Sequence, residues 1–263
     1  MFDYHMHTKR CGHARGEMYQ YVEKALELGF EEMGFSDHFP FIDRIRPELA
    51  MPLSQLPGYV QDVEEIRKRY PQITIRLGTE VDYFPHLEKE IGELLSQYPF
   101  DYVIVGVHFI DDWNFDNPNE ISEWQKRDVN EVYEQYISLL QQAANSKLFN
   151  IIAHCDLVKI FGYRSTKDLH DQWDALIQCF VQNKLTVEIS TAGLYKPVGE
   201  IYPSEDIIKL LKKYHVPIVI SSDAHHPEYV GRSFDQAMAL VRKFGLRNFA
   251  RFERRKLLLT FKN

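Results

Sequence analysis

Residues 1–13 read MFDYHMHTKRCGH and contain the pattern on which the interpretation of the whole chain depends. Alternate side chains lie on one face of an extended strand, so His5 and His7 can reach the same metal ion. A further histidine, His13, follows after a Cys-Gly turn. A single His-x-His pair is weak evidence, because histidines are common in turns. A metal centre is therefore indicated only if the rest of the chain supplies ligands at comparable positions.

The composition is that of an ordinary globular enzyme. The chain has 263 residues, enough for one α/β barrel or two smaller domains. A formal net charge of −7 argues against nucleic acid as the main partner. Three cysteines without a Cys-x-x-Cys pair argue against a disulfide framework. No signal peptide, long apolar run or lipidation motif is recognisable, which predicts a cytoplasmic enzyme with no membrane partner.

Short β-rich runs alternate with amphipathic helical windows, a pattern typical of parallel α/β architecture. We predict strands over residues 2–7, 32–36, 73–78, 100–107, 149–153, 185–190 and 217–221. Helices are predicted over residues 17–28, 59–70, 87–97, 129–147, 167–183, 204–214 and 229–244. The long loop over residues 109–126 is expected to form a wall of a substrate pocket. This order predicts seven strand–helix units in one domain, residues 1–263.

Six of the seven predicted strands end in a histidine or a carboxylate. In (β/α) barrels the side chains at the C-terminal strand ends converge on one face, which holds the active site. Residues far apart in the sequence are therefore expected to share one pocket. The converging set contains seven histidines and two carboxylates: His5, His7, His13, His38, Glu80, His108, His154, Asp223 and His225.

This set predicts a cluster of metal ions. Nine ligands are too many for one ion, because divalent transition metals take four to six. Two or three ions fit the number, with a carboxylate such as Glu80 bridging a pair. Nitrogen and oxygen ligands favour zinc, iron or manganese over an iron–sulfur cluster. Such ions lower the pKa of a bridging water and neutralise a phosphoester, so the set predicts hydrolysis by a metal-bridging hydroxide.

Each of these residues taken alone also has a purely structural interpretation. A strand-end histidine such as His108 is commonly a satisfied structural residue, residues 80–82 can be a solvated strand end, and residues 36–38 can cap a helix. The metal interpretation is favoured because seven of the eleven histidines occupy strand-end motifs. Cys11 and Cys155 flank ligands but are interpreted as ordinary cytosolic thiols. The other histidines are expected on the surface: His86, His170, His215 and His226.

The nine-residue ligand pattern resembles that of the polymerase and histidinol phosphatase (PHP) superfamily, and none of its metal positions is missing. Residues 79–82, 100–108, 191–196 and 202–204 further resemble the stand-alone histidinol-phosphatase branch. The resemblance implies a distorted (β/α)7 TIM-like barrel with a trinuclear metal centre at the C-terminal ends of the strands. It also implies hydrolysis of L-histidinol phosphate to L-histidinol and phosphate, a step of histidine biosynthesis.

The same resemblance implies a ligand set for each of three ions. The first ion would bind His5, His7, Glu80 and Asp223. The second would bind Glu80, His108 and His154, and the third His13, His38 and His225. Asp223 is the candidate catalytic residue, accepting a proton from the nucleophilic water or donating one to the leaving alkoxide. Asp37 and Asp156 remain alternatives for this role.

The substrate needs protein contacts in addition to the metals. Phosphate groups are bound by cationic side chains. Four candidates lie just past predicted strand ends: Arg15, Lys159, Arg164 and Lys196. Lys196 is the strongest of them because it follows the family-like Thr-Ala-Gly turn. For the ammonium and imidazole groups, the acidic and aromatic loop 109–126 provides Asp112 and Trp113 as candidates.

Two other functions stay open at this point. The same metal core could serve a phosphoesterase acting on another small phosphoester, such as a nucleotide or phosphotyrosine. Alternatively, the ligands could belong to a non-catalytic metal-binding or regulatory protein, although the intact ligand set argues against it. The sequence predicts neither the native metal nor the oligomeric state.

Overall fold

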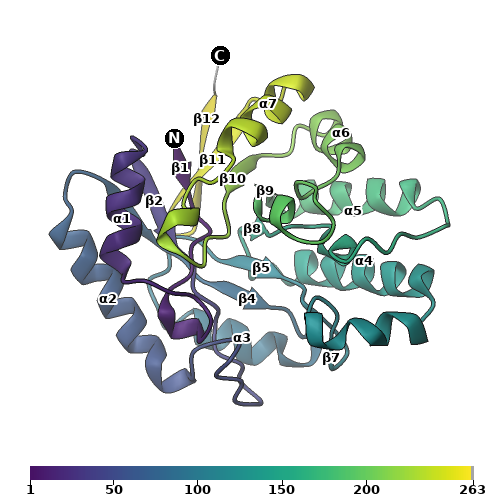
Figure 1. The fold of residues 1–263 in the computed structure, drawn as a ribbon, viewed down its shortest axis with the longest axis horizontal. Coiled ribbons are helices and arrows are strands. Elements are labelled where there is room, and N and C mark those ends of the chain that lie inside the picture. Colours follow the sequence, from purple (N-terminus) through teal and green to yellow (C-terminus); the bar gives the residue numbers. More distant parts are fainter. Residues whose placement is uncertain (262–263) are drawn as a thin grey trace.

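Parallel strands at the centre of the molecule are surrounded by helices (Figure 1). The computed structural model describes residues 1–261. One sheet consists of β1 (Phe2–Asp3), β2 (Glu32–Phe35) and β3 (Thr74–Leu77), all parallel. The second sheet has the order β12-β11-β10-β9-β8-β5-β4. Its strands are β4 (Glu80–Asp82), β5 (Ile104–Gly106), β8 (Ile151–Ile152), β9 (Thr186–Ser190), β10 (Ile218–Ser221), β11 (Asn248–Glu253) and β12 (Lys256–Phe261).

The two sheets meet where the segments that follow β1 and β2 reach the second sheet. Isolated bridges pair Met6 with Ala224, just after β10, and His38 with Glu80 of β4. The His7 amide donates to the Ala224 carbonyl at 2.9 Å. Both bridges lie beyond the C-terminal ends of β1 and β2. They therefore bring histidines of the first sheet next to the ligand residues of the second.

All seven predicted helices are present, with ends that differ by a few residues. They are α1 (Met18–Glu27), α2 (Leu56–Arg69), α3 (Glu88–Leu95), α4 (Val129–Ser146), α5 (His170–Gln182), α6 (Glu205–Lys213) and α7 (Phe234–Phe244). Helix α2 begins before residue 59 because Pro57 is tolerated in a first helical turn. Helix α7 begins after residue 229 because residues 227–229 form a separate short turn. No helix of the described part of the chain is long and apolar enough to cross a membrane.

The predicted strands are present but shorter, and a further strand, β4, follows the one predicted over residues 73–78. Residues 74–77 pair with β2, whereas residues 80–82 pair with β5. The prediction ended the first strand at residue 7, but β1 ends at Asp3 and continues only as the isolated bridge at Met6. Gly78 and Thr79 thus mark the point where the chain changes from one sheet to the other.

The sequence analysis did not predict two hairpins. Strands β11 and β12 form an antiparallel pair after α7. They lie beyond the last predicted helix, in residues for which no element was predicted. Inside the loop 109–126, β6 (Phe109–Ile110) pairs with β7 (Trp113–Asn114), and a 3-10 helix spans Pro118–Lys126. The segment predicted as a loop therefore contains short elements of secondary structure that were not predicted.

A buried tyrosine connects the two sheets beneath the bridges. Tyr102, just before β5, is fully buried. Its hydroxyl lies 2.6 Å from the Tyr4 carbonyl and 3.1 Å from the Phe35 carbonyl. A Cβ atom at Gly34 or Gly78 would collide with its ring. The two glycines therefore leave space for the Tyr102 ring. Its hydroxyl can then form hydrogen bonds with backbone carbonyls of the first sheet.

Replacing Tyr102 by phenylalanine should lower the free energy of unfolding by about 1–3 kcal/mol, because a buried carbonyl loses its donor. Urea denaturation measures this change. Tyr98→Phe is the matched control, since the half-buried Tyr98 hydroxyl bonds to no other described residue, and it should change stability by less than about 0.5 kcal/mol. Equal effects of the two substitutions would contradict the proposed role of the Tyr102 hydroxyl.

Candidate metal centre

The carboxylate of Glu80 lies at the meeting point of the two sheets and is 1% exposed. Its Oε2 atom is 3.2 Å from His5 Nε2 and 3.2 Å from His38 Nδ1. Its Oε1 atom is 3.2 Å from His154 Nε2. The other imidazoles near the carboxylate are those of His7, at 3.6 Å, and His108, at 3.8 Å. Five histidines from distant parts of the sequence thus surround one buried carboxylate.

Local sequence makes room for this arrangement. Gly106 lies opposite Asp82 in the β4–β5 pair. A Cβ atom at Gly106 would lie 2.8 Å from Glu80 Oε1 and would also crowd the His108 ring. Glycine at this position therefore allows the carboxylate and the imidazole to approach each other.

A second carboxylate, Asp223, faces the same histidines from the end of β10. Its Oδ1 atom lies 3.1 Å from His7 Nε2 and 3.6 Å from His5 Nε2. The Asp223 backbone has a φ of 50°, a left-handed conformation that costs free energy for a residue other than glycine. This strained turn brings the Asp223 carboxylate and the His225 ring to the same place, with His225 Nδ1 3.5 Å from Oδ1.

The His13 ring completes the cluster. Its centroid is 4.7 Å from that of His225 and 5.4 Å from that of His38. Its Nδ1 atom lies 3.1 Å from the carbonyl oxygens of Cys11 and Glu48. Because both partners are acceptors, Nδ1 must carry the proton, which leaves Nε2 free to bind a metal.

These donors fit divalent metal ions. Ligand atoms lie within 4.8 Å of one another in the groups His5-His7-Glu80, Glu80-His108-His154 and His7-His38-His225. Several of them are buried without a hydrogen-bond partner in the described structure, namely His5 Nε2, both nitrogens of His7, His38 Nδ1 and Glu80 Oε1. Unpartnered buried polar atoms are costly, and bound cations would satisfy them.

The third predicted ligand set differs in part from the groups in the structure. His38 and His225 group with His7, while His13 groups with Cys11 and His225. The Cys11 thiol is fully buried, and this burial raises its pKa to about 12. At neutral pH this thiol is protonated, whereas a thiol that binds a metal is deprotonated.

Neighbouring groups and burial shift the pKa of several residues in this cluster. Burial alone would raise the pKa of the Glu80 and Asp223 carboxyls, but the nearby His5 lowers both well below the ordinary values. Burial and the neighbouring His7 lower the pKa of His38 and His225 well below the ordinary histidine value. In contrast, although burial lowers a histidine pKa, Glu188 raises the pKa of His5 and Asp82 raises that of His108 to about 10. These imidazoles must therefore lose a proton when a metal binds.

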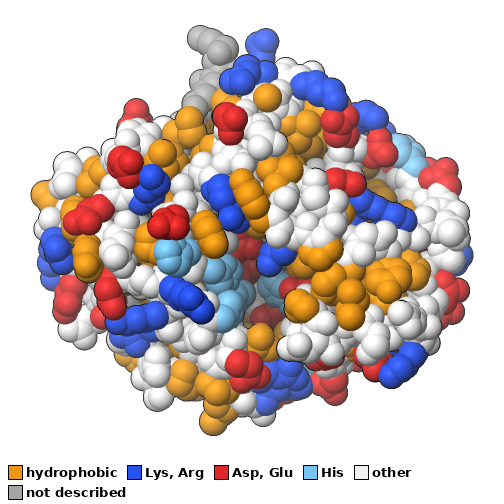
Figure 2. Space-filling model, in the orientation of Figure 1, with side chains coloured by type: hydrophobic (Ala, Val, Ile, Leu, Met, Phe, Trp, Pro, Cys, Tyr) orange, Lys and Arg blue, Asp and Glu red, His pale blue; other side chains and the backbone are white. Residues whose placement is uncertain are grey.

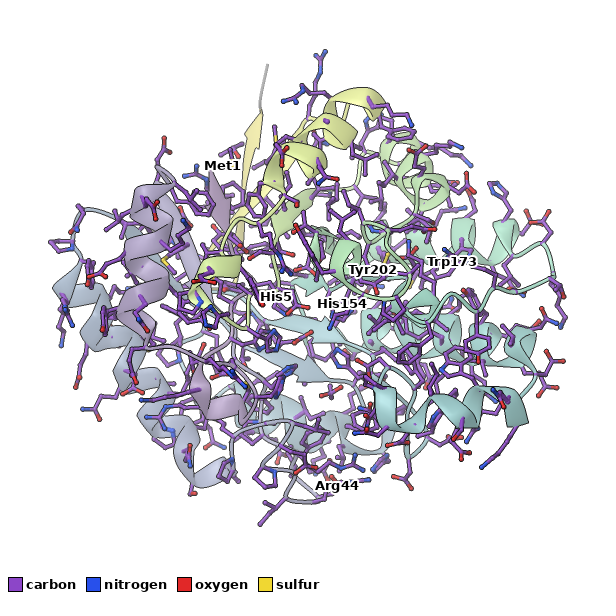
Figure 3. The ribbon with its side chains drawn as sticks, viewed as in Figure 1. Met1, His5, Arg44, His154, Trp173 and Tyr202 are labelled. Carbon is purple, nitrogen blue, oxygen red and sulfur yellow. The ribbon has the colours of Figure 1, made fainter. Side chains whose placement is uncertain are left out.

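A cavity of about 660 Å³ opens over the cluster. Figure 2 shows a hollow in which pale blue histidine atoms gather, with blue cationic side chains at its border. Figure 3 shows His5 and His154 close together at the centre of the molecule. Glu80, Asp223 and four of the histidines line this cavity, together with Asn114, Asp116, Tyr195, Lys196, Tyr229 and Arg232. A small molecule can therefore reach the clustered histidines and carboxylates.

A family model of the PHP domain matches residues 3–192. The chain belongs to the PHP domain family. A probable histidinol-phosphatase of Deinococcus radiodurans is 35% identical over 258 residues, which cover 97% of each chain. The histidinol-phosphatase of Bacillus subtilis is 29% identical over 89% of this chain and 96% of its own. The fold is that of a Lactococcus lactis histidinol phosphate phosphatase solved with zinc, L-histidinol and phosphate, with a TM-score of 0.84, 22% identity and 98% coverage of both chains.

Carboxylates that orient the ligands of this PHP centre were missed by the sequence analysis. Glu188 of β9 is fully buried and accepts a bond from His5 Nδ1 at 2.6 Å, while its other oxygen accepts the His154 amide at 2.9 Å. Asp82 holds His108 Nδ1 at 2.7 Å. Such bonds fix the tautomer and the orientation of a metal-binding imidazole. The available signal was a single glutamate in the otherwise uncharged strand 186–190.

Of the six predicted substrate-binding residues, the structure places only Lys196 in the lining of the PHP cavity. Asp112 is exposed and pairs with Arg44, which Figure 3 places at the edge of the molecule. Trp113 turns inward from the β6–β7 hairpin and packs against Trp124, with ring centroids 5.1 Å apart. The tight hairpin turn separates these neighbours, since it directs one outward and one into the core.

The other three cations also lie outside this lining. Lys159 is fully buried, 2.9 Å from an Asp156 oxygen and 3.1 Å from a Glu200 oxygen. Arg164 pairs with the same Glu200 at 2.7 Å, and both cations line a separate cavity of about 650 Å³. The Arg15 side chain is exposed. Glu200, a carboxylate remote in the sequence, thus pairs with two of the cations expected to bind phosphate.

Substituting Glu188 by glutamine should weaken zinc binding by about 10- to 100-fold, because His5 loses the charged partner that orients it. Competition with a chromogenic chelator measures this affinity. Glu205→Gln is the control, since this half-exposed carboxylate pairs only with the surface residue Lys243. Zinc affinity within twofold of the unmodified protein would show that Glu188 does not support the site.

Proposed function

We propose that this PHP protein is a histidinol-phosphatase, which hydrolyses L-histidinol phosphate to L-histidinol and phosphate in histidine biosynthesis. The observation that carries the proposal is the Glu80 carboxylate enclosed by five imidazoles beside a cavity of about 660 Å³. This volume suits a small phosphomonoester. Similarity to a probable histidinol-phosphatase over 97% of both chains supports the choice of substrate.

We assign the nine ligands to three divalent ions, which can be zinc, iron or manganese. His5, His7, Glu80 and Asp223 would hold the first ion. Glu80, His108 and His154 would hold the second, and His13, His38 and His225 the third. When bound, the ions supply Lewis acidity and hydroxide at neutral pH. Glu188 and Asp82 keep the imidazoles in the orientation that this binding requires.

Asp223 is the best candidate for proton transfer. It lines the cavity, and its lowered pKa keeps it ionised, which favours accepting a proton from water over donating one. The alternatives are less suitable, because neither lines the cavity. Buried Asp37 accepts the Thr8 hydroxyl and its neighbour's amide, and Asp156 accepts the Lys159 ammonium.

The two ends of the substrate meet different chemistry in the cavity. Lys196 follows β9 and has no ion-pair partner among the described residues, so it is available to the phosphate. Asp116 and Asn114 follow β5 and provide acceptors for the ammonium and imidazole groups. The sheet order places β8 between β9 and β5. This separation supports a bound substrate that spans the cavity.

The proposed function also implies a domain organisation, a set of partners and a location. We describe the chain as one PHP-type domain, residues 1–263, with a distorted (β/α)7 barrel. The Met6–Ala224 and His38–Glu80 bridges support closure of this barrel. The expected partner is the small substrate alone, without nucleic acid or membrane, in the cytoplasm where a biosynthetic enzyme of this kind acts.

The zinc-loaded protein should hydrolyse L-histidinol phosphate with a kcat/KM at least about tenfold above that for other small phosphomonoesters, since only this substrate uses both ends of the cavity. A panel containing a nucleotide, phosphotyrosine and p-nitrophenyl phosphate measures this preference. Chelation should abolish turnover of every substrate. If a nucleotide or phosphotyrosine leads the panel, the substrate assignment is wrong, and full metal occupancy without any turnover would contradict an enzymatic function.

The Asp223→Asn substitution should lower kcat by about 10²- to 10⁴-fold, because the amide cannot accept the proton. The rate is compared at matched zinc content, measured by atomic emission. Asp112→Asn, at an exposed position paired with Arg44, is the control and should leave kcat unchanged. If the metal-loaded Asp223→Asn variant keeps nearly full activity, Asp223 is not the proton acceptor and another group carries out this step.

A further inference from the structure

Two residues of the Lys and Arg type line the main cavity, Lys196 and Arg232. Arg232 falls inside the helix predicted over residues 229–244 and was not among the predicted site residues. In the structure it belongs to the loop between β10 and α7. This loop also carries Asp223 and His225. Arg232 is therefore a cation on the same loop as two of the proposed metal ligands.

The guanidinium of Arg232 is held between two aromatic rings. Its Cζ atom lies 3.3 Å from the centroid of the Tyr195 ring and 4.0 Å from that of Tyr229. Both tyrosines line the cavity and are partly exposed, at 50% and 39%. Stacking of this kind uses the faces of the planar guanidinium. The N–H groups at its edge remain free to donate hydrogen bonds.

Hydrogen bonds fix the position of this aromatic sandwich. The Arg232 carbonyl accepts the Thr191 hydroxyl at 2.7 Å, and the Arg232 amide donates to the Tyr229 carbonyl at 3.0 Å. The Tyr195 hydroxyl lies 2.6 Å from Ser233 Oγ. The loops after β9 and β10 thus hold the arginine and one of its rings together. Arg232 and Tyr195 therefore lose little conformational entropy when a ligand binds.

The charge of Arg232 is not neutralised. Within residues 1–261 no carboxylate forms an ion pair with it, and its guanidinium donates no hydrogen bond to the protein. Its Nε atom is buried without a partner. In contrast, Arg164 and Lys159 are both paired with Glu200. A free guanidinium beside a metal cluster is electrostatically favourable only when an anion is bound in the cavity.

We propose that Arg232 is a phosphate-binding residue, whose guanidinium, held between Tyr195 and Tyr229, donates hydrogen bonds to the phosphate oxygens of the substrate. Tyr195 and Tyr229 are positioning residues that act through Arg232. Guanidinium groups bind phosphate in a bidentate manner, which gives both affinity and orientation. The substrate name rests on the proposed function, but the phosphate contact does not depend on the alcohol to which the phosphate is attached.

Titration calorimetry with inorganic phosphate and the zinc-loaded protein tests this assignment without relying on turnover. Arg232→Gln should weaken phosphate binding by about 10- to 100-fold, the loss expected for hydrogen bonds to a charged group. Arg232→Lys keeps the positive charge and should weaken phosphate binding less than Arg232→Gln does. Arg164→Gln, which removes a paired cation outside this cavity, should change the affinity for phosphate by less than twofold. The affinity of the Arg232→Gln variant for L-histidinol should also stay within twofold of that of the unmodified protein. Zinc content is measured for each protein.

The Tyr195→Leu variant separates positioning from a direct contact. It should weaken phosphate binding when Arg232 is present and have no further effect in the Arg232→Gln background. The proposal is overturned if Arg232→Gln binds phosphate within twofold of the unmodified protein, or if its affinities for phosphate and L-histidinol fall equally. If the calorimetric result holds while L-histidinol phosphate fails to lead the substrate panel, only the proposed substrate is wrong.

Discussion

The burial of the Glu80 carboxylate is the constraint on which the rest of the structure depends. An ionised carboxylate that is 1% exposed is stable only when positive charge or strong donors surround it. The chain meets this requirement with imidazoles that follow β1, β2, β5 and β8. Each of these segments must therefore end at the same place. The fold and the metal centre follow from the same requirement.

The meeting of the two sheets satisfies this requirement in a specific way. The segments after β1 and β2 leave their own sheet and pair with residues next to β10 and in β4. Beneath this crossing, Tyr102 fills the space that Gly34 and Gly78 leave and bonds to the backbone of the first sheet. The packing of an apolar ring thus sets the separation of the sheets. That separation in turn sets the distances among the histidines at their ends.

Sequence periodicity predicted the parts of this arrangement that depend on local rules. A strand-end histidine can be recognised because the strand itself is recognisable, and the convergence of strand ends is general for such folds. The contacts of charged side chains do not follow from local rules. Lys159 looked like a phosphate ligand, yet its partner Glu200 lies far along the chain. Trp113 was predicted to bind the substrate, but the hairpin directs it into the core against Trp124. Glu188 was missed because a single glutamate in an apolar strand does not reveal which groups its carboxylate contacts.

The contrast between Lys159 and Arg232 shows how the protein holds cations for two different purposes. Carboxylate partners stabilise the Lys159 ammonium and at the same time cancel its charge. Lys159 can therefore stabilise the fold, but it attracts an anionic ligand only weakly. Aromatic faces stabilise Arg232 without supplying a counter-charge. The full positive charge and the edge N–H groups then remain directed to an anion. A site that must release phosphate after each turnover benefits from this arrangement, because a fixed carboxylate would compete with the substrate for the same donors.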